Sequence, residues 1–473
     1  MAEAASLYAE RVKVYPQRIA GRFRTIKWVV LIALLSIYYL APWLRWDRGP
    51  NAPDQALLVD MAGRRAYFFW IEIWPQEVYY LTGLLILGAI GLFLVTSVAG
   101  RVWCGFTCPQ TVWTDLYLLV ERWIEGDRNR RIKLDQESWS MRKLGLKLAK
   151  HAVWLLIAFA TGGAWIMYFN DAPTVVREIF TGQASSAVYG FTALFTATTY
   201  LLAGWAREQV CIYMCPWPRF QGAMFDEHTL IVTYADWRGE KRGHAKRNED
   251  FSKRGHCIDC GLCVHVCPTG IDIRNGQQLA CIGCGLCVDA CNSVMPKVGL
   301  PQDLIAYDSL WNQALKAKGD KAPAWRLLRP RTFIYAAIFV AVAALMMVGL
   351  ATRSHLDVTL LADRAPLFVK LSNGDIQNGY SIKISNKLRE PASYQIRIDG
   401  IDGLSFKLVG HTNDVVEVPG DSVGTFRLLA RAPRSAIEER SNSIQVTIQD
   451  TVSKEESRHD AIFSGPGNST DGN

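Results

Sequence analysis

The sequence predicts a polytopic α-helical membrane protein with a cysteine-rich segment before its last membrane helix and an immunoglobulin-like β-sandwich at its C-terminal end. Three observations predict this fold class. Five stretches are apolar and free of charge over about the 20 residues that cross a bilayer. All twelve cysteines fall into four compact groups, and the chain after Cys291 contains none. From about Ser354 onward, the pattern changes to short alternating runs separated by turn residues.

The five apolar stretches predict transmembrane helices. They cover approximately residues 28–44, 78–98, 152–169, 187–206 and 333–350, and none contains Asp, Glu, Lys, Arg or His. Buried helices of a large soluble protein can mimic one or two such runs, but five are not expected there. No small-residue cleavage site follows the first stretch, so it is predicted to be an anchor and not a removed signal peptide.

The distribution of Lys and Arg predicts the orientation of these helices. Residues 1–27 carry six of them, residues 99–151 carry ten and residues 207–332 carry seventeen. The intervening loops 45–77 and 170–186 carry four and one. Positive charge accumulates on the cytoplasmic side, so the N-terminus and both long loops are predicted to be cytoplasmic and the tail after Leu350 to lie outside. This bias accounts for most of the net charge of +8, and no nucleic-acid binding is needed to explain it.

Two of the cysteine groups are near-copies with the spacing of a bacterial ferredoxin. They read Cys257-Ile-Asp-Cys260-Gly-Leu-Cys263-Val-His-Val-Cys267-Pro268 and Cys281-Ile-Gly-Cys284-Gly-Leu-Cys287-Val-Asp-Ala-Cys291. In such runs the fourth cysteine binds the neighbouring cluster. The pattern therefore predicts a cytoplasmic bacterial-type ferredoxin domain with two [4Fe–4S] clusters. One is held by Cys257, Cys260, Cys263 and Cys291, and the other by Cys281, Cys284, Cys287 and Cys267.

A structural zinc site is the alternative interpretation of these runs. Zinc prefers two separated Cys-x-x-Cys pairs that supply four ligands, whereas each run here supplies four cysteines within eleven residues. The glycines Gly261 and Gly285, each just after a second cysteine, are expected to let the backbone approach the cluster closely. Asn292 stands where the first run has a proline, which weakens the turn but removes no ligand.

The other two groups form a second repeated motif. Cys104-Gly-Phe-Thr-Cys108-Pro109 follows the second apolar stretch, and Cys211-Ile-Tyr-Met-Cys215-Pro216 follows the fourth. Two cysteines four apart lie on one face of a helical turn, and the proline is expected to end or bend the helix. Since both pairs emerge on the predicted cytoplasmic side, they are expected to converge into one four-thiolate site.

Three interpretations of the paired cysteines stay open. A soft thiolate site suits Cu(I) or a further iron–sulfur cluster. The pairs can instead cycle between dithiol and disulfide during electron transfer. They can also be small buried residues that pack helix ends, although the duplication of spacing and proline argues against this.

The C-terminal region predicts a β-sandwich. Alternating runs at residues 355–361, 380–385, 393–398, 425–429 and 443–448 are separated by turn signals such as Asn373-Gly374, Asn378-Gly379 and Pro419-Gly420. Roughly seven short strands in about 110 residues fit an immunoglobulin-like fold. The predicted organisation is as follows: an N-terminal cytoplasmic segment (1–27), a four-helix transmembrane region (28–225), the ferredoxin domain with linkers (226–332), a fifth transmembrane helix (333–350), a periplasmic sandwich (351–463) and a disordered tail (464–473).

This combination resembles the cytochrome c oxidase accessory proteins, the CcoG, FixG or RdxA family, which accompany cbb-type oxidases in bacteria. The resemblance rests on the order of the paired motifs, the eight-cysteine loop, the fifth span and the sandwich, and it covers essentially the full length. It implies a multi-pass protein of the bacterial inner membrane that reduces Cu(II) to Cu(I) for the copper centre of the oxidase. It implies copper handling at Cys104, Cys108, Cys211 and Cys215, and cluster ligation by the eight cysteines from Cys257 to Cys291.

The resemblance also implies partners, namely cbb-type oxidase subunits or copper chaperones and an unidentified cytosolic electron donor. Two other functions stay open. Related membrane polyferredoxins with similar paired motifs pass quinol electrons toward exported reductases. A redox-sensing assembly scaffold, in which the sandwich docks an oxidase subunit, is the non-enzymatic alternative.

Overall fold

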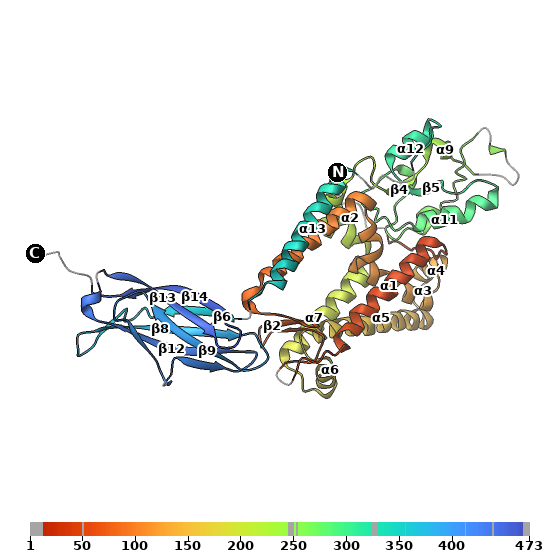
Figure 1. The fold of residues 1–473 in the computed structure, drawn as a ribbon. Coiled ribbons are helices and arrows are strands. Elements are labelled where there is room, and N and C mark those ends of the chain that lie inside the picture. The colour runs from red at the N-terminus through yellow and green to blue at the C-terminus, as the bar shows by residue number, and fades with distance from the viewer. Residues whose placement is uncertain are drawn as a thin grey trace, which may run out of the picture. The chain divides into compact units, whose positions relative to one another are not determined.

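The computed structural model describes residues 13–49, 52–244, 250–251, 254–323, 329–354, 356–411, 413–437 and 439–466. The chain divides into two compact units. One comprises Met1–Trp46 with Gln55–Met346, and the other comprises Asp47–Asp54 with Met347–Asn473. The first contains the long helices and all the cysteines, and the second contains the β-sandwich (Figure 1). The predicted disordered tail falls mainly on residues 467–473, which lie outside the described residues.

Five helices are long and apolar enough to cross a membrane, as predicted. They contain α1 (Arg22–Leu40), α2 (Tyr79–Ala99), α5 (Met141–Met167), α7 (Ser186–Thr199) and α13 (Pro330–Ala351). Helix α5 begins eleven residues before the predicted span at 152, because its polar N-terminal part is stabilised by ion pairs. In that part, Lys147 and Lys150 both contact Glu125. Helices α2 and α13 lie side by side (Figure 1), and a side chain at Gly83 would meet the Met346 sulfur.

The connection between α1 and α2 holds a small antiparallel sheet that the sequence did not predict. Its strands β1 (Leu57–Asp60), β2 (Arg65–Phe68) and β3 (Ile71–Ile73) pair in sequence order. The buried amide of Gln55 fixes the sheet to the helices, because it donates to the Met167 carbonyl oxygen at 2.7 Å and accepts from the Ala172 amide at 2.9 Å. Ala172 begins helix α6 (Ala172–Thr181).

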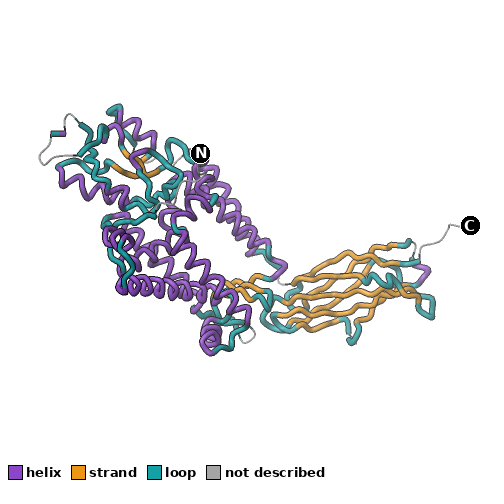
Figure 2. Tube along the Cα trace, turned by 180° about the vertical axis from the view of Figure 1, so that it is seen from behind, coloured by secondary structure: helices purple, strands orange, loops and turns teal. Residues whose placement is uncertain are grey.

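The cysteine-rich segment packs around a two-stranded antiparallel sheet. Strands β4 (Ile231–Tyr234) and β5 (Ile305–Asp308) flank the two cysteine runs in sequence and pair with each other (Figure 1). The short helix α10 (Leu262–His265) and helix α11 (Leu286–Val294) each begin within one run. In Figure 2 most of the chain around these strands is loop. The remaining α-helices among the described residues of the unit are α3 (Pro109–Ile124), α4 (Arg128–Gln136), α8 (Trp217–Met224), α9 (Asp236–Gly239) and α12 (Leu310–Ala317).

The second unit is a sandwich of two antiparallel sheets. One sheet has the order β10-β12-β8-β6 with β7 also on β8, and the other has the order β11-β9-β13-β14. The strands are β6 (Leu356–Ala362), β7 (Val369–Lys370), β8 (Ile376–Asn386), β9 (Ala392–Asp399), β10 (Ser405–Leu408), β11 (Val415–Val418), β12 (Ser422–Ala432), β13 (Ser441–Asp450) and β14 (Glu456–Ser464). Every predicted strand falls on one of them.

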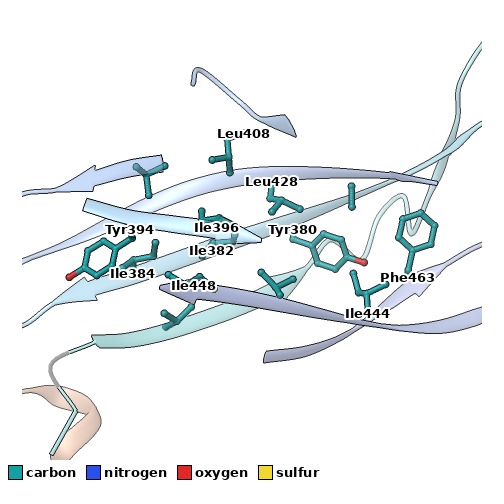
Figure 3. Close-up of a cluster of buried hydrophobic side chains, with 14 of the residues drawn as sticks. Tyr380, Ile382, Ile384, Tyr394, Ile396, Leu408, Leu428, Ile444, Ile448 and Phe463 are labelled. Atoms are coloured by element: carbon teal, nitrogen blue, oxygen red, sulfur yellow. The ribbon is translucent and has the colours of Figure 1, made fainter. Parts of the chain in front are cut away.

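Alternate residues of both sheets point inward and form one continuous core, including Ile382, Ile396 and Leu428 (Figure 3). One predicted turn is wrong. Asn378 and Gly379 lie inside β8, paired with Ala430 and Leu429. A side chain at Gly379 would collide with the Asp363 carboxylate. The glycine is therefore needed because Asp363 lies close to the strand, and not because the chain turns here.

Candidate metal centre

The first of two cysteine-lined hollows is lined by the four cysteines that were predicted to hold one cluster. An empty volume of about 400 Å³ is lined by four cysteines together with apolar side chains such as Met295 and Leu304. The four are Cys257, Cys260, Cys263 and Cys291. Cys291 reaches this hollow from α11, in the other run, and lies close enough to the remaining three for their charges to interact. We call these residues the first cysteine set.

The second hollow is built in the same way from the complementary residues. An empty volume of about 350 Å³ is lined by Cys267 from the first run and by Cys281, Cys284 and Cys287 from the second. We call these four the second cysteine set. Cys263 lines both hollows, so the two sets are adjacent.

Left-handed backbone at equivalent positions turns each run around its hollow. Gly261 and Gly285 have φ of 66° and 71° and form the N-caps of α10 and α11. Asp259 and Gly283, two residues earlier, have φ of 52° and 65°. Residues with a β-carbon are strained in this region, which explains why three of the four are glycine.

The chemistry of the donors fits iron–sulfur clusters. Burial raises the pKa of the Cys281 and Cys291 thiols to about 12. A buried thiol of this kind ionises only beside a strong positive charge, and bound metal supplies that charge. Each hollow is lined by a complete set of four thiols drawn from both runs, which is the ligand arrangement of two crossed [4Fe–4S] clusters.

The two paired motifs adopt the same unusual local structure. Each lies on a π-helical turn, Trp103–Thr107 in one copy and Val210–Met214 in the other, where an α-helical turn was expected. In both copies the amide of the second cysteine donates to the carbonyl five residues earlier, at 2.9 Å for Cys108 and 2.7 Å for Cys215. Such turns are rare and frequent at functional sites. Pro109 begins α3, so the proline does end the preceding turn.

The structure brings the two pairs together. Cys104 interacts electrostatically with Cys108, Cys211 and Cys215, and Cys211 interacts with Cys108 and Cys215. Burial raises the pKa of the Cys104 and Cys211 thiols to about 12. Cys215 is exposed, so one side of the group is open. We call these four residues the paired thiols.

The paired thiols lie against the second cysteine set and not against the first. Cys104 and Cys211 pack on the buried cluster that contains Cys284. At Gly105 a β-carbon would lie 2.8 Å from the Gly283 carbonyl oxygen and 3.0 Å from the Cys284 α-carbon. The backbone of the first paired motif is therefore in direct contact with the backbone of the second cysteine run.

Sequence reasoning missed one residue of this site. The Cys104 thiol donates to Oε1 of Gln221 at 3.2 Å, and the Gln221 amide donates to the Thr96 hydroxyl at 3.3 Å. Gln221 is fully buried in α8. Its position six residues after Cys215 was the available signal, but the corresponding position after Cys108 is Thr114, so the motif repeat did not reveal it.

Three family models match the chain. Residues 206–310 match a 4Fe–4S dicluster domain, and residues 81–131 match a 4Fe–4S binding domain. Residues 346–466 match the Ig-like fold at the C-terminus of FixG. The predicted ferredoxin-type domain and the immunoglobulin-like sandwich are thereby confirmed.

Curated relatives match along nearly the whole chain. Protein RdxB of Cereibacter sphaeroides is 50% identical and covers 98% of this chain and 99% of its own length. Protein RdxA of the same organism is 50% identical over 91% of each chain. Nitrogen fixation protein FixG of Rhizobium meliloti is 45% identical over 98% of this chain and 94% of its own.

Proposed function

Because this chain belongs to the FixG/RdxA family of multi-pass iron–sulfur proteins, we propose that it reduces Cu(II) to Cu(I) for the copper centre of a cbb-type cytochrome c oxidase. The reduced ion would form at the paired thiols. The observation that carries the proposal is the direct contact between Gly105, inside a paired motif, and the Gly283–Cys284 backbone of the second cysteine set.

The protein residues have separable roles in this proposal. The first and second cysteine sets would each hold one [4Fe–4S] cluster, with ligands crossed between the runs. When bound, such clusters supply one-electron transfer over a wide range of potentials. Apolar side chains such as Met295 and Leu304 line the first hollow. Beside the second, the backbone amides of Gly283 and Leu286 lie within hydrogen-bonding reach of the Cys281 and Cys284 sulfurs.

Copper enters as the substrate. Cu(I) is softer than Cu(II), so thiolate sulfur stabilises the reduced ion relative to the oxidised one. The exposed Cys215 gives the ion access, and the more buried Cys104 and Cys211 lie on the side of the second cysteine set.

We infer the location and the partners from the same reasoning. The Lys and Arg distribution puts the cysteine sets on the cytoplasmic side of the bacterial inner membrane and the sandwich in the periplasm. An unidentified cytosolic donor would supply the electrons. The Cu(I) would pass to oxidase subunits or to copper chaperones.

Serine substitution at Cys104, Cys108, Cys211 and Cys215 tests the proposal in the full-length protein, purified without oxygen. Loss of a thiolate should lower Cu(II) reduction, followed with a Cu(I)-specific chelator, at least about tenfold. Iron content and the visible cluster absorbance should stay at the wild-type level. T107A is the matched control, because Thr107 lies on the same turn and its hydroxyl donates only to the Trp103 carbonyl oxygen in the described structure. Copper reduction at the wild-type rate in all four serine variants would remove the proposed site.

One observation favours quinol oxidation as a second candidate function. Among the described residues, an open pocket has a lining that includes His151, Trp154, Lys150, Trp205 and Glu208. Glu208 also interacts electrostatically with Cys211. Aromatic rings beside groups that exchange protons suit a quinol ring. Quinol oxidation by the purified protein, at the same rate with and without copper, would favour this function over copper reduction.

A further inference from the structure

The two copies of the paired motif have the same backbone but different surroundings. In the first copy the residue after the first cysteine is Gly105, which touches the second cysteine set. In the second copy that residue is Ile212. A side chain of this size does not fit where Gly105 lies, since even a β-carbon there would come within 2.8 Å of a carbonyl oxygen. Only the first copy therefore has a residue small enough to make this contact.

The arginine that precedes each motif also makes different contacts in the two copies. Arg101 is 6% exposed and donates from Nη1 to the Cys281 carbonyl oxygen at 2.8 Å and also to that of Leu279. From Nη2 it donates to the Pro218 carbonyl oxygen at 2.7 Å. Arg101 lies three residues before Cys104, and Pro218 lies three residues after Cys215. A single guanidinium group therefore links the second cysteine set to the segments next to both copies of the paired motif.

Arg207, the corresponding residue of the second copy, points elsewhere. Its Nε donates to the Gly204 carbonyl oxygen at 2.7 Å, and its Nη2 pairs with the Glu121 carboxylate. Glu121 also pairs with the buried Arg131. Arg207 therefore belongs to an ion network that fixes α3 and α4, and within the described part of the chain its side chain forms no hydrogen bond with either cysteine set.

We propose that Arg101 is the positioning residue that couples the second cysteine set to the paired thiols, so that electrons reach copper from the second set and not from the first. This inference rests on the proposed copper reduction. Each electron that leaves the second set converts one Cu(II) at the paired thiols to Cu(I), and no proton is transferred.

Two physical effects of Arg101 can be separated. Its positive charge lies beside Cys281 and Cys104 and stabilises a reduced, more negative cluster. Its three hydrogen bonds hold the two sulfur groups at a fixed separation, and electron transfer slows steeply as separation grows. Lysine keeps the charge but cannot reproduce the planar fork that bridges carbonyl groups on two segments.

The test uses R101Q and R101K in the anaerobic full-length protein. An EPR-monitored redox titration should show that R101Q lowers the potential of one cluster only, whereas R101K leaves both near their wild-type values. Hydrogen exchange should rise in both variants at residues 278–285 and not at 257–263. Oxidation of the prereduced protein by Cu(II) should slow about 10- to 100-fold in both variants. R219Q is the matched control and should match the wild type, because Arg219 is an exposed cation on α8 one residue after Pro218.

G105A tests the same contact from its other side without changing charge. It should raise exchange at 278–285 and slow the oxidation by Cu(II), with both potentials retained. G145A is its control, because a β-carbon at Gly145 meets nothing within 4 Å. If R101Q lost its iron, R101K and G105A would decide the question.

The outcomes separate the two proposals. Equal shifts of both potentials in R101Q, or wild-type oxidation rates in R101K and G105A, would overturn the positioning role. If the serine variants of the paired thiols reduced copper normally while R101Q still shifted one potential and loosened residues 278–285, the copper function would fail. The coupling between the second set and the paired motifs would then stand without copper as its substrate.

Discussion

At the scale of single residues, buried charges hold the start of the first membrane helix. Asp115, in α3, accepts two hydrogen bonds from Arg24 at 2.9 Å and lies 3.7 Å from Lys27, with all three side chains almost fully buried. The Asp289 carboxylate, between Cys287 and Cys291 in the sequence, accepts hydrogen bonds from the amides of Phe23 and Arg24. A carboxylate at a helix N-terminus is favoured by the helix dipole, so these contacts join α1 to the cysteine-rich segment.

D115N should destabilise the protein strongly. The substitution leaves the Arg24 and Lys27 charges buried without a counter-ion, which costs about 3–5 kcal/mol. We expect a lower midpoint of thermal unfolding in detergent, measured by tryptophan fluorescence. D320N is the control, because Asp320 is exposed and its substitution should leave the midpoint unchanged.

The pH dependence of this effect has a definite sign. Burial alone would raise the pKa of Asp115, but Lys27 and Arg24 together outweigh burial and hold the pKa below its ordinary value of 3.8. The stabilisation is therefore present above pH 3.8 and disappears as the pH falls through the folded pKa. The difference between wild type and D115N should be constant near neutral pH and shrink only in strong acid. A difference that shrank near pH 6 would contradict this assignment.

At the scale of elements, the sandwich depends on strands that bury alternate residues. Phe463 in β14 is fully buried and lies beside Tyr380 of the facing sheet (Figure 3). The Tyr380 hydroxyl donates to the Ile462 carbonyl oxygen at 2.8 Å, which ties β8 to β14 across the core.

F463A should therefore destabilise the sandwich by about 3–5 kcal/mol through lost burial and the cavity left behind. Pulse proteolysis of the full-length protein in urea should show cleavage within residues 347–466 at a lower urea concentration. V423T is the control, because Val423 in β12 is 47% exposed. Iron content should be the same in both variants, and a loss of iron in F463A would show that the cysteine sets depend on the sandwich.

At the scale of the whole molecule, the two compact units have separate cores. All the cysteines lie in the first unit, and the sandwich core contains none of them. Cluster binding is thus expected to be independent of the sandwich. In the described structure each of the two hollows is lined by one complete cysteine set, with Cys263 lining both, whereas none of the paired thiols lines either hollow.

Iron analysis of the anaerobically purified chain should consequently find about eight irons per molecule. C287S should lower the iron content, because Cys287 lines the second hollow, and C215S should not. A chain that ends at residue 351 should retain the full iron content. About twelve irons, with four of them lost in C215S, would instead show a further cluster at the paired thiols.

Local pattern was sufficient to predict the classes of structure in this protein. A run of apolar residues specifies a membrane helix through its own transfer free energy, and alternation specifies a strand through its period of two. Cysteine spacing specifies a cluster-binding loop, because the ligands of one cluster lie mostly within one short segment. These properties depend on near neighbours in the chain, so the sequence alone determined the five helices, the two cysteine runs, the paired motifs and the sandwich.

Tertiary structure decided which of these parts meet. Arg101 and Cys281 are 180 residues apart, and no local pattern indicates that Arg101 bonds to the second cysteine run while Arg207 pairs with Glu121, or that Gly105 approaches Gly283. The small sheet β1–β3, the glycine inside β8 and the buried Gln221 escaped prediction for the same reason. Their roles come from contacts with distant segments, and the free energy of such contacts depends on how the elements pack, which no short stretch of sequence records.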